Sequence, residues 1–249
     1  MIRLEQLIEA IDARHGSLLR KTTMNDLTII FLTVNRVPKE WAKFHRTELE
    51  KAIGDSPVIS ISREPIDFGT NLIQTEKESM SNIWFQLLRG AKLATTKYIA
   101  VAEDDTLYPE EHFSLRPPDN TVGYNLSRWV VNIERRKPHY YYYHPRAINA
   151  SLIGPRDLII KTLDERYKNH PNGTPERYTG EIGRSGIERL LGVEPVQKTS
   201  LYTNIPIIQI KHNYRRPELS DVRGVSPKDN RSYDLPHWGN VENIINKFI

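Results

Sequence analysis

Residues 97–105, KYIAVAEDD, join an apolar, β-forming run directly to three carboxylates, Glu103, Asp104 and Asp105. A short apolar run bounded by such a break is typical of a buried strand in a central sheet. The carboxylates then lie at the carboxyl end of the strand, where open α/β sheets bind their ligands. The sequence therefore predicts an α/β fold with a candidate site at this strand end.

The three adjacent carboxylates repel one another, and burying them without partners is costly. A divalent cation removes that cost, because Mg²⁺ and Mn²⁺ take oxygen ligands, usually one or two carboxylates together with substrate phosphates. We therefore predict a site in which Mn²⁺ or Mg²⁺ bridges protein carboxylates and a phosphate. The alternative interpretation is a solvated acidic turn that begins the next loop.

The composition fits one large globular domain: of 249 residues, 38% are hydrophobic and 27% are charged. There is no cysteine, so a metal must be held by oxygen or imidazole. The net charge of +4 permits a polyanionic partner without requiring one. The first ten residues lack the apolar centre of a signal peptide, and no apolar run is long enough to span a bilayer. We expect a cytoplasmic protein.

Strand and helix patterns alternate in the first half of the chain. Strands are expected at 27–34, 57–62 and 97–102, separated by a helix that Pro38 opens and a helix at 79–94. This β-α-β-α-β order predicts a parallel sheet with right-handed crossovers. The second half is less regular, with strands expected within 122–132, at 140–144 and at 205–210, and helices after Gly154-Pro155 and at 185–191.

We divide the chain into three parts: an N-terminal helical segment (1–26), a catalytic domain (27–212) and a C-terminal flap or tail packed on it (213–249). In the middle part, polar residues follow each of the first three strands. Because parallel strands bring their carboxyl ends to one edge, a nucleotide can lie there. Its base and ribose would be near the first two strand ends and its diphosphate at the third.

This order of elements resembles the GT-A glycosyltransferases, especially the family-2-like branch. The matching features are the strand into Thr33-Val34-Asn35-Arg36, the helix with Ser81-Asn82, the strand into Glu103-Asp104-Asp105, and the late strand into His212. The resemblance covers roughly residues 27–212 and concerns order and residue type, since Glu103-Asp104-Asp105 is not literally the family's Asp-X-Asp. It implies a mostly parallel, GT-A-like sheet flanked by helices, with a smaller antiparallel part on the acceptor side.

The resemblance also implies a nucleotide-sugar donor, most often a UDP-sugar, and a role for each matching residue. Asp105 corresponds to the principal metal-binding aspartate, with Glu103 and His212 as further ligands, and Asp104 contacts the ribose or the metal. The other residues implied in donor binding are Thr33, Asn35, Arg36, Arg63 and Asn82.

The stretch Gly180-Glu181-Ile182-Gly183-Arg184 lies where the family has its acceptor-side acidic residue. An inverting transfer needs a carboxylate base within hydrogen-bond reach of the acceptor hydroxyl. We choose Glu181 as that base, because the flanking glycines let a substrate approach the backbone closely. Arg184 would contact a phosphate or the acceptor, and the alternative is a simple Glu181–Arg184 ion pair. Glu188 is expected on the solvated face of the following helix.

Cations and aromatic residues interleave in two stretches of the second half, and we predict that they bind the acceptor. Cations neutralise nucleic-acid phosphates and aromatic faces stack on bases, so one predicted acceptor is DNA. In this respect the chain is similar to phage-type glycosyltransferases that modify hydroxymethylated bases. A saccharide or lipid-linked saccharide is the equal alternative, since sugars also stack on tyrosine. The candidate residues are Arg128, Arg135, Arg136, Tyr142 and Arg215.

Two other functions compete with this one. A nucleotidyltransferase needs a glycine-rich loop after the first strand, and no glycine occurs between Val34 and Gly54. A non-enzymatic nucleic-acid-binding protein explains the basic stretches but leaves the carboxylates at a strand end without a role.

Overall fold

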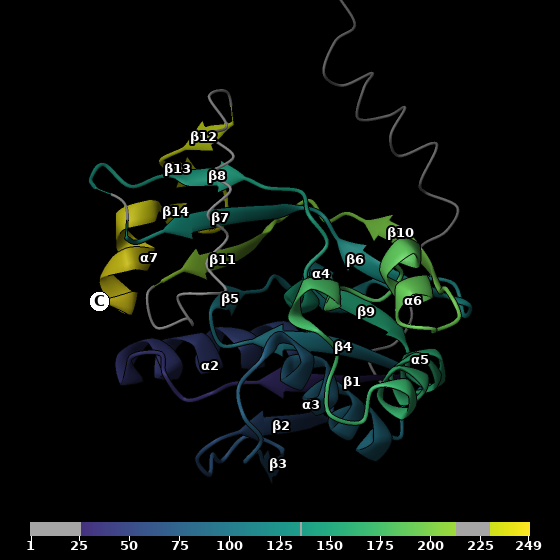
Figure 1. Cartoon of the computed structure of the whole chain (residues 1–249). Coiled ribbons are helices and arrows are strands. Elements are labelled where there is room, and N and C mark those ends of the chain that lie inside the picture. Colours follow the sequence, from purple (N-terminus) through teal and green to yellow (C-terminus); the bar gives the residue numbers. More distant parts are fainter. Residues whose placement is uncertain (1–25, 135, 213–229) are drawn as a thin grey trace, which may run out of the picture.

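A computed structural model describes residues 26–134, 136–212 and 230–249 and contains two main β-sheets, one above the other in Figure 1. The larger has seven strands in the order β10-β6-β9-β4-β1-β2-β3. All its pairings are parallel except those of β9, which runs antiparallel to β4 and β6. The mostly parallel α/β class predicted from the sequence is therefore confirmed. The strands are β1 (Leu27–Leu32), β2 (Val58–Ser62), β3 (Thr70–Ile73), β4 (Tyr98–Glu103), β6 (Thr121–Asn125), β9 (Leu152–Pro155) and β10 (Gln197–Leu201).

Helices cover both faces of this sheet because the side chains of β1 alternate between them. Ile30 and Leu32 pack in one apolar cluster with residues of α3 (Met80–Leu93) and α5 (Arg156–Asn169). Ile29 and Phe31 pack in another with α2 (Lys39–Ile53) and the short α4 (Glu110–Ser114). At Gly90 of α3, an added Cβ would lie 2.8 Å from the Ile30 side chain, so glycine permits the close packing of α3 on β1.

The second sheet has the order β12-β8-β7-β11-β5 and is mixed, with β7 and β11 parallel and the other pairs antiparallel. Its strands are β5 (Thr106–Leu107), β7 (Arg128–Asn132), β8 (Tyr141–Tyr143), β11 (Ile207–Lys211) and β12 (Arg231–Ser232). The single strand expected within 122–132 is in fact two, β6 and β7, which belong to different sheets. A tight turn separates them, in which Arg128 N donates to Leu126 O (2.8 Å).

The C-terminal residues form a third apolar cluster on the second sheet. A hairpin of β13 (Asp234–Leu235) and β14 (Gly239–Asn240) leads into α7 (Val241–Phe248), whose buried face packs with Trp41, Leu107 and Tyr141. Residues 230–249 are therefore packed on the domain, whereas the predicted N-terminal helical segment up to residue 25 and the stretch 213–229 lie outside the described residues. The remaining short elements are α6 (Ser185–Leu190) and the 3-10 turns at Asn149–Ser151 and Glu176–Tyr178.

In the described parts of the chain, no helix has the length and apolar character needed to cross a membrane.

Candidate functional site

The acidic residues lie where the two sheets join. β4 of the first sheet ends at Glu103 and β5 of the second begins at Thr106, so Asp104 and Asp105 form the connection between them. The chain order of the first sheet also reverses here, since β2 and β3 continue on one side of β1 while β4 lies on the other. Ligands of open α/β sheets bind outside the carboxyl ends of the strands at such a reversal.

Each carboxylate of the acidic turn has its own polar partner. Asn149 donates to Glu103 Oε1 (2.8 Å), and Thr33 at the end of β1 donates to Asp104 Oδ2 (2.5 Å). The Thr106 hydroxyl donates to Asp105 Oδ1 (2.9 Å). These donors stabilise the three carboxylates, which offsets the repulsion expected from their adjacency in sequence.

Asp105 and His212 form a buried acid–imidazole pair. Asp105 Oδ2 lies 3.9 Å from His212 Nε2, and both side chains are less than a tenth exposed. The sheet brings them together because β11 pairs antiparallel with β5, and Ile210 N donates to the Asp105 carbonyl (2.8 Å). The structure thus brings together two residues that the sequence analysis assigned to one metal site and that lie far apart in the chain.

This pair fits a hard divalent cation. Two ligands that each lie about 2.1 Å from one ion are roughly 3–4 Å apart, and Mg²⁺ or Mn²⁺ sites commonly use few protein ligands and complete their shell with phosphate oxygens. Within the described residues there is no group of three or more metal-ligating side chains. The predicted set of Glu103, Asp105 and His212 therefore does not form one cluster, and Glu103 instead accepts the bond from Asn149.

Three of the predicted donor-binding residues tie the strand ends together. Asn35 adopts a left-handed backbone (φ 57°), and its Oδ1 accepts from Arg63 N (2.8 Å) and Glu64 N (3.0 Å). Arg36 and Arg63 both reach Glu78, at 2.6 and 3.4 Å. The structure thus brings these residues to the same edge as Asp104 and gives each cation an acidic partner.

Asn82 belongs to a chain of buried amides that the sequence analysis missed. Gln74 donates to the Thr33 carbonyl (3.0 Å), Asn82 donates to Gln74 (3.0 Å) and Gln86 donates to Asn82 (2.7 Å). These bonds link the ends of β1 and β3 to the first turns of α3. Glutamines at 74 and 86 have no distinguishing spacing in the sequence, so only the fold reveals them.

The segment that carries Glu181 is attached to the start of α3, at the same edge of the sheet. Thr174 N donates to Ser81 Oγ (2.9 Å), and the Tyr167 hydroxyl donates to the Ser81 carbonyl. Glu181 pairs with Arg184 (3.4 Å), which is the ion pair considered as the alternative.

Glu188 does not lie on a solvated face, so that expectation was wrong. Its side chain is fully buried and accepts from Gly183 N (2.7 Å) and Val196 N (3.2 Å). The Gly183 and Val196 amide groups need an acceptor here, and this requirement overrides the exposure that a charged residue on a short helix would otherwise have.

Two of the predicted acceptor-binding residues are buried in the second sheet. Arg128 is 2% exposed, and it donates from Nε to the His144 carbonyl (3.0 Å) and from Nη1 to Gln209 Oε1. Tyr142 is 5% exposed. Neither offers an acceptor an open surface, which corrects the expectation for both. Arg136 is exposed, and Arg135 and Arg215 lie outside the described residues.

No protein-family model and no curated protein matches this chain. Several solved structures are similar to it. TarS from S. aureus in complex with UDP-GlcNAc is 11% identical with a TM-score of 0.40, over 75% of this chain and 59% of that one. A glycosyltransferase involved in glycosylation of the major capsid of PBCV-1 is 11% identical with a TM-score of 0.42, over 74% and 91%. The mannosyltransferase PcManGT from Pyrobaculum calidifontis, in complex with GDP-Man and Mn²⁺, is 12% identical with a TM-score of 0.43, over 82% and 64%.

Two of these proteins are by name glycosyl- or mannosyltransferases, the class that the sequence resemblance implies. This chain covers 36% to 60% of the length of the TarS chains that are similar to it.

Proposed function

We propose that this protein is a glycosyltransferase that moves a sugar from a nucleotide-sugar donor, a UDP-sugar, to a hydroxyl acceptor with the help of a divalent cation. The observation that carries the proposal is the buried Asp105–His212 pair at the point where the strand order reverses. An acid and an imidazole in that position suit a cation that also binds a phosphate.

Asp105 and His212 would hold Mn²⁺ or Mg²⁺, which supplies charge stabilisation for the leaving diphosphate when bound. Asp104, oriented by Thr33, would bind the ribose. Arg36 and Arg63, together with Glu78, would border the nucleotide at the neighbouring strand ends. The amide chain that contains Asn82 links the ends of β1 and β3.

Glu181 is proposed as the base and Arg184 as the residue that holds its carboxylate. In an inverting transfer, the acceptor oxygen forms a bond to the anomeric carbon while the bond from that carbon to the diphosphate oxygen breaks. The hydroxyl proton passes to Glu181. The products are a glycoside and a nucleoside diphosphate, so the reaction needs no further reactant.

For the acceptor we propose a hydroxymethylated base in DNA. The net charge of +4 and the exposed Arg136 favour a polyanion. The alternative acceptor is a saccharide or lipid-linked saccharide, and the experiment below distinguishes it from DNA.

The first test is thermal unfolding with a panel of nucleotide sugars, with and without Mn²⁺, on the wild type and Asp105→Asn. A ligand at about a hundred times its dissociation constant adds roughly 2.7 kcal/mol, a shift on the order of 5–10 °C for this size. Asp55→Asn is the matched control, because this exposed carboxylate lies just before β2, at the opposite edge of the sheet.

We expect a Mn²⁺-dependent shift with one donor, lost in Asp105→Asn and kept in Asp55→Asn. That donor can then be tested for transfer to hydroxymethylated DNA and to oligosaccharides. If no donor shifts the wild type while plain DNA does, the protein is a nucleic-acid-binding protein and the proposed activity is wrong.

A further inference from the structure

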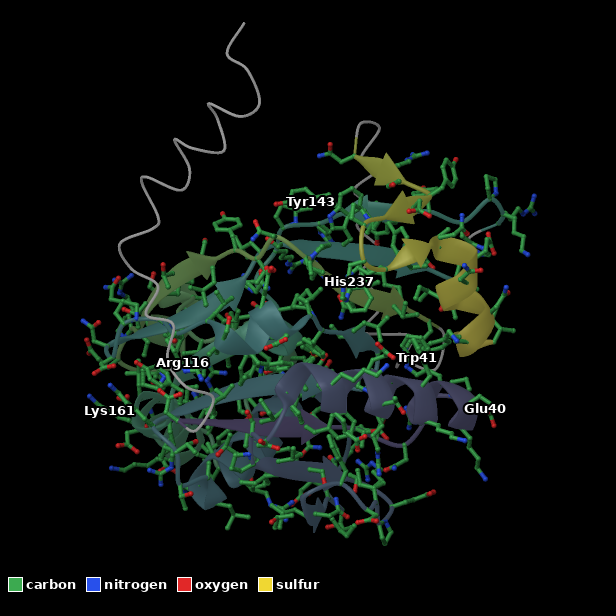
Figure 2. The ribbon with its side chains drawn as sticks, turned by 180° about the vertical axis from the view of Figure 1, so that it is seen from behind. Glu40, Trp41, Arg116, Tyr143, Lys161 and His237 are labelled. Atoms are coloured by element: carbon green, nitrogen blue, oxygen red, sulfur yellow. The ribbon has the colours of Figure 1, made fainter. Side chains whose placement is uncertain are left out.

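Helix α2 contacts the acidic turn through two side chains one helical turn apart. Trp41 Nε1 donates to the Asp104 carbonyl (2.7 Å), and His45 Nε2 donates to the Thr106 carbonyl (2.8 Å). Both side chains are buried. Figure 2 shows Trp41 on α2, on the side that faces the second sheet. Positions i and i+4 lie on one face of a helix, which lets the two rings reach the same turn.

The carbonyl between these two is also held. Asp105 O accepts from Ile210 N of β11 (2.8 Å), so three consecutive carbonyls of the acidic turn each receive one hydrogen bond. A buried carbonyl keeps its orientation when turning it would leave it without a donor. The peptide groups on both sides of Asp105 are therefore fixed, and so is the direction in which its side chain leaves the backbone.

His45 donates from Nε2, so the ring carries its hydrogen on that nitrogen. A carbonyl oxygen only accepts, so the hydrogen must be on the ring nitrogen that faces Thr106. Burial lowers the pKa of His45 to about 4, so the ring is neutral at neutral pH. It stacks on Phe31 (5.8 Å between ring centroids), and Trp41 lies on another side (6.2 Å).

The same cluster reaches His212. The Phe248 ring of α7 lies 4.8 Å from the Trp41 ring and 5.0 Å from the His212 ring, measured between centroids. Trp41 therefore contacts, directly or through Phe248, both sides of the Asp105–His212 pair.

We propose that Trp41 and His45 are positioning residues of the cation site: by fixing the carbonyls of Asp104 and Thr106, the residues before and after Asp105, they aim the Asp105 carboxylate at His212 and at the cation. This inference rests on the proposed function, because it assumes that Asp105 binds a cation. Groups that orient metal ligands from behind typically change metal affinity by ~10–100-fold when they are lost.

The test is the dissociation constant of Mn²⁺ in the presence of UDP, measured by isothermal titration calorimetry below the unfolding temperature of every variant. His45→Leu and Trp41→Phe remove the donors, whereas His45→Gln places an amide N–H where Nε2 was. Leu49→Ala is the matched control, because Leu49 is a buried residue of the same helix that packs in the core around Phe31. It lowers stability without touching the acidic turn.

We expect His45→Leu and Trp41→Phe to weaken Mn²⁺ binding by ~10–100-fold. His45→Gln should restore most of the affinity, and Leu49→Ala should lower the unfolding temperature but leave the affinity of the folded protein unchanged. If the role of His45 were purely structural, Leu49→Ala would weaken Mn²⁺ binding as much as His45→Leu, and His45→Gln would not restore it.

Two further outcomes separate this inference from the proposed function. If Asp105→Asn abolishes binding while His45→Leu and Trp41→Phe bind like the wild type, the positioning role is wrong and the cation site stands. If the wild type itself binds no Mn²⁺ with UDP, the proposed function is wrong and the positioning role is wrong with it.

Discussion

Thr33 and Asp104 are 71 residues apart in sequence, and the Thr33 hydroxyl donates to the Asp104 carboxylate at 2.5 Å. The bond joins the carboxyl ends of β1 and β4, the two parallel strands between which the order of the sheet reverses. The same hydroxyl accepts from Asn35 N (2.9 Å). One small side chain thus sets both the start of the loop after β1 and the direction of a carboxylate on the neighbouring strand.

Replacing Thr33 with valine keeps the shape of the side chain and removes the hydroxyl. A hydrogen bond to a charged group contributes about 1.5–3 kcal/mol, so we expect the donor to bind roughly 10–100-fold more weakly. Thr33→Ser keeps the hydroxyl and should bind within a few-fold of the wild type. Calorimetric titration with the donor that stabilises the wild type checks this, and equal affinities for the two variants would contradict a role of Thr33 in orienting Asp104.

Glu181 and Glu188 are seven residues apart and should respond to the same change in different ways. Glu181→Gln removes the proposed base, so single-turnover transfer should slow by ~10²–10⁴-fold with donor affinity and unfolding temperature unchanged. Glu188→Gln leaves one of the two backbone N–H groups that donate to Glu188, those of Gly183 and Val196, facing an amide donor, at a cost of about 1–3 kcal/mol. We therefore expect Glu188→Gln to unfold at a lower temperature but to transfer sugar normally while folded. Normal transfer by Glu181→Gln would place the base elsewhere.

Variants of Arg128 and Arg136 should distinguish a structural arginine from one that binds the acceptor. Arg128→Leu removes a buried donor and leaves Gln209 and the His144 carbonyl without it, so the unfolding temperature should fall by several degrees. Arg136 is exposed, and Arg136→Ala should leave stability unchanged. If the acceptor is DNA, this variant should bind it more weakly and with a salt dependence reduced by about one counterion. An unchanged salt dependence would argue for a saccharide acceptor.

The central strands and the acidic turn were predictable because their signals are local. β1 and β4 are buried, mostly apolar runs that lead into polar residues, and the pattern of α3 places Trp84, Leu87 and Ala91 on one buried stripe. β3 was missed because its four residues are exposed or only partly buried, which leaves no alternation to detect. The junction of β6 and β7 was missed because the turn between them is only Leu126-Ser127 and carries no glycine or proline to mark it.

The roles of individual polar residues were less predictable, since they depend on partners far away in sequence. Arg128 is buried because Gln209, 81 residues later, accepts from it, and Gln74 is buried because it donates to the Thr33 carbonyl, 41 residues earlier. From their polar side chains alone, Arg128 and Gln74 would both be expected at the surface. The Asp105–His212 pair was found only because the resemblance to a family linked the two positions.

The buried ring of His112 predicts how the stability of the protein depends on pH. Burial lowers the pKa of this fully buried ring to about 3, compared with 6.5 when it is exposed. Above pH 6.5 the ring is neutral in the folded and unfolded states, so it has no effect on the pH dependence there. Below pH 6.5 the unfolded chain takes up a proton that the folded ring does not, so stability falls as the pH falls towards 3.

This group alone should remove about 2 kcal/mol of unfolding free energy between pH 6.5 and 5.0, because one pKa unit corresponds to ~1.4 kcal/mol. In His112→Gln, an amide oxygen can accept from Asn125, as His112 Nδ1 does in the wild type (3.2 Å), and no proton is taken up. Urea unfolding at the two pH values should therefore show a smaller loss for this variant, by roughly that amount. An equal loss in the wild type and the variant would show that His112 is protonated in the folded protein too, and that its burial does not control acid stability.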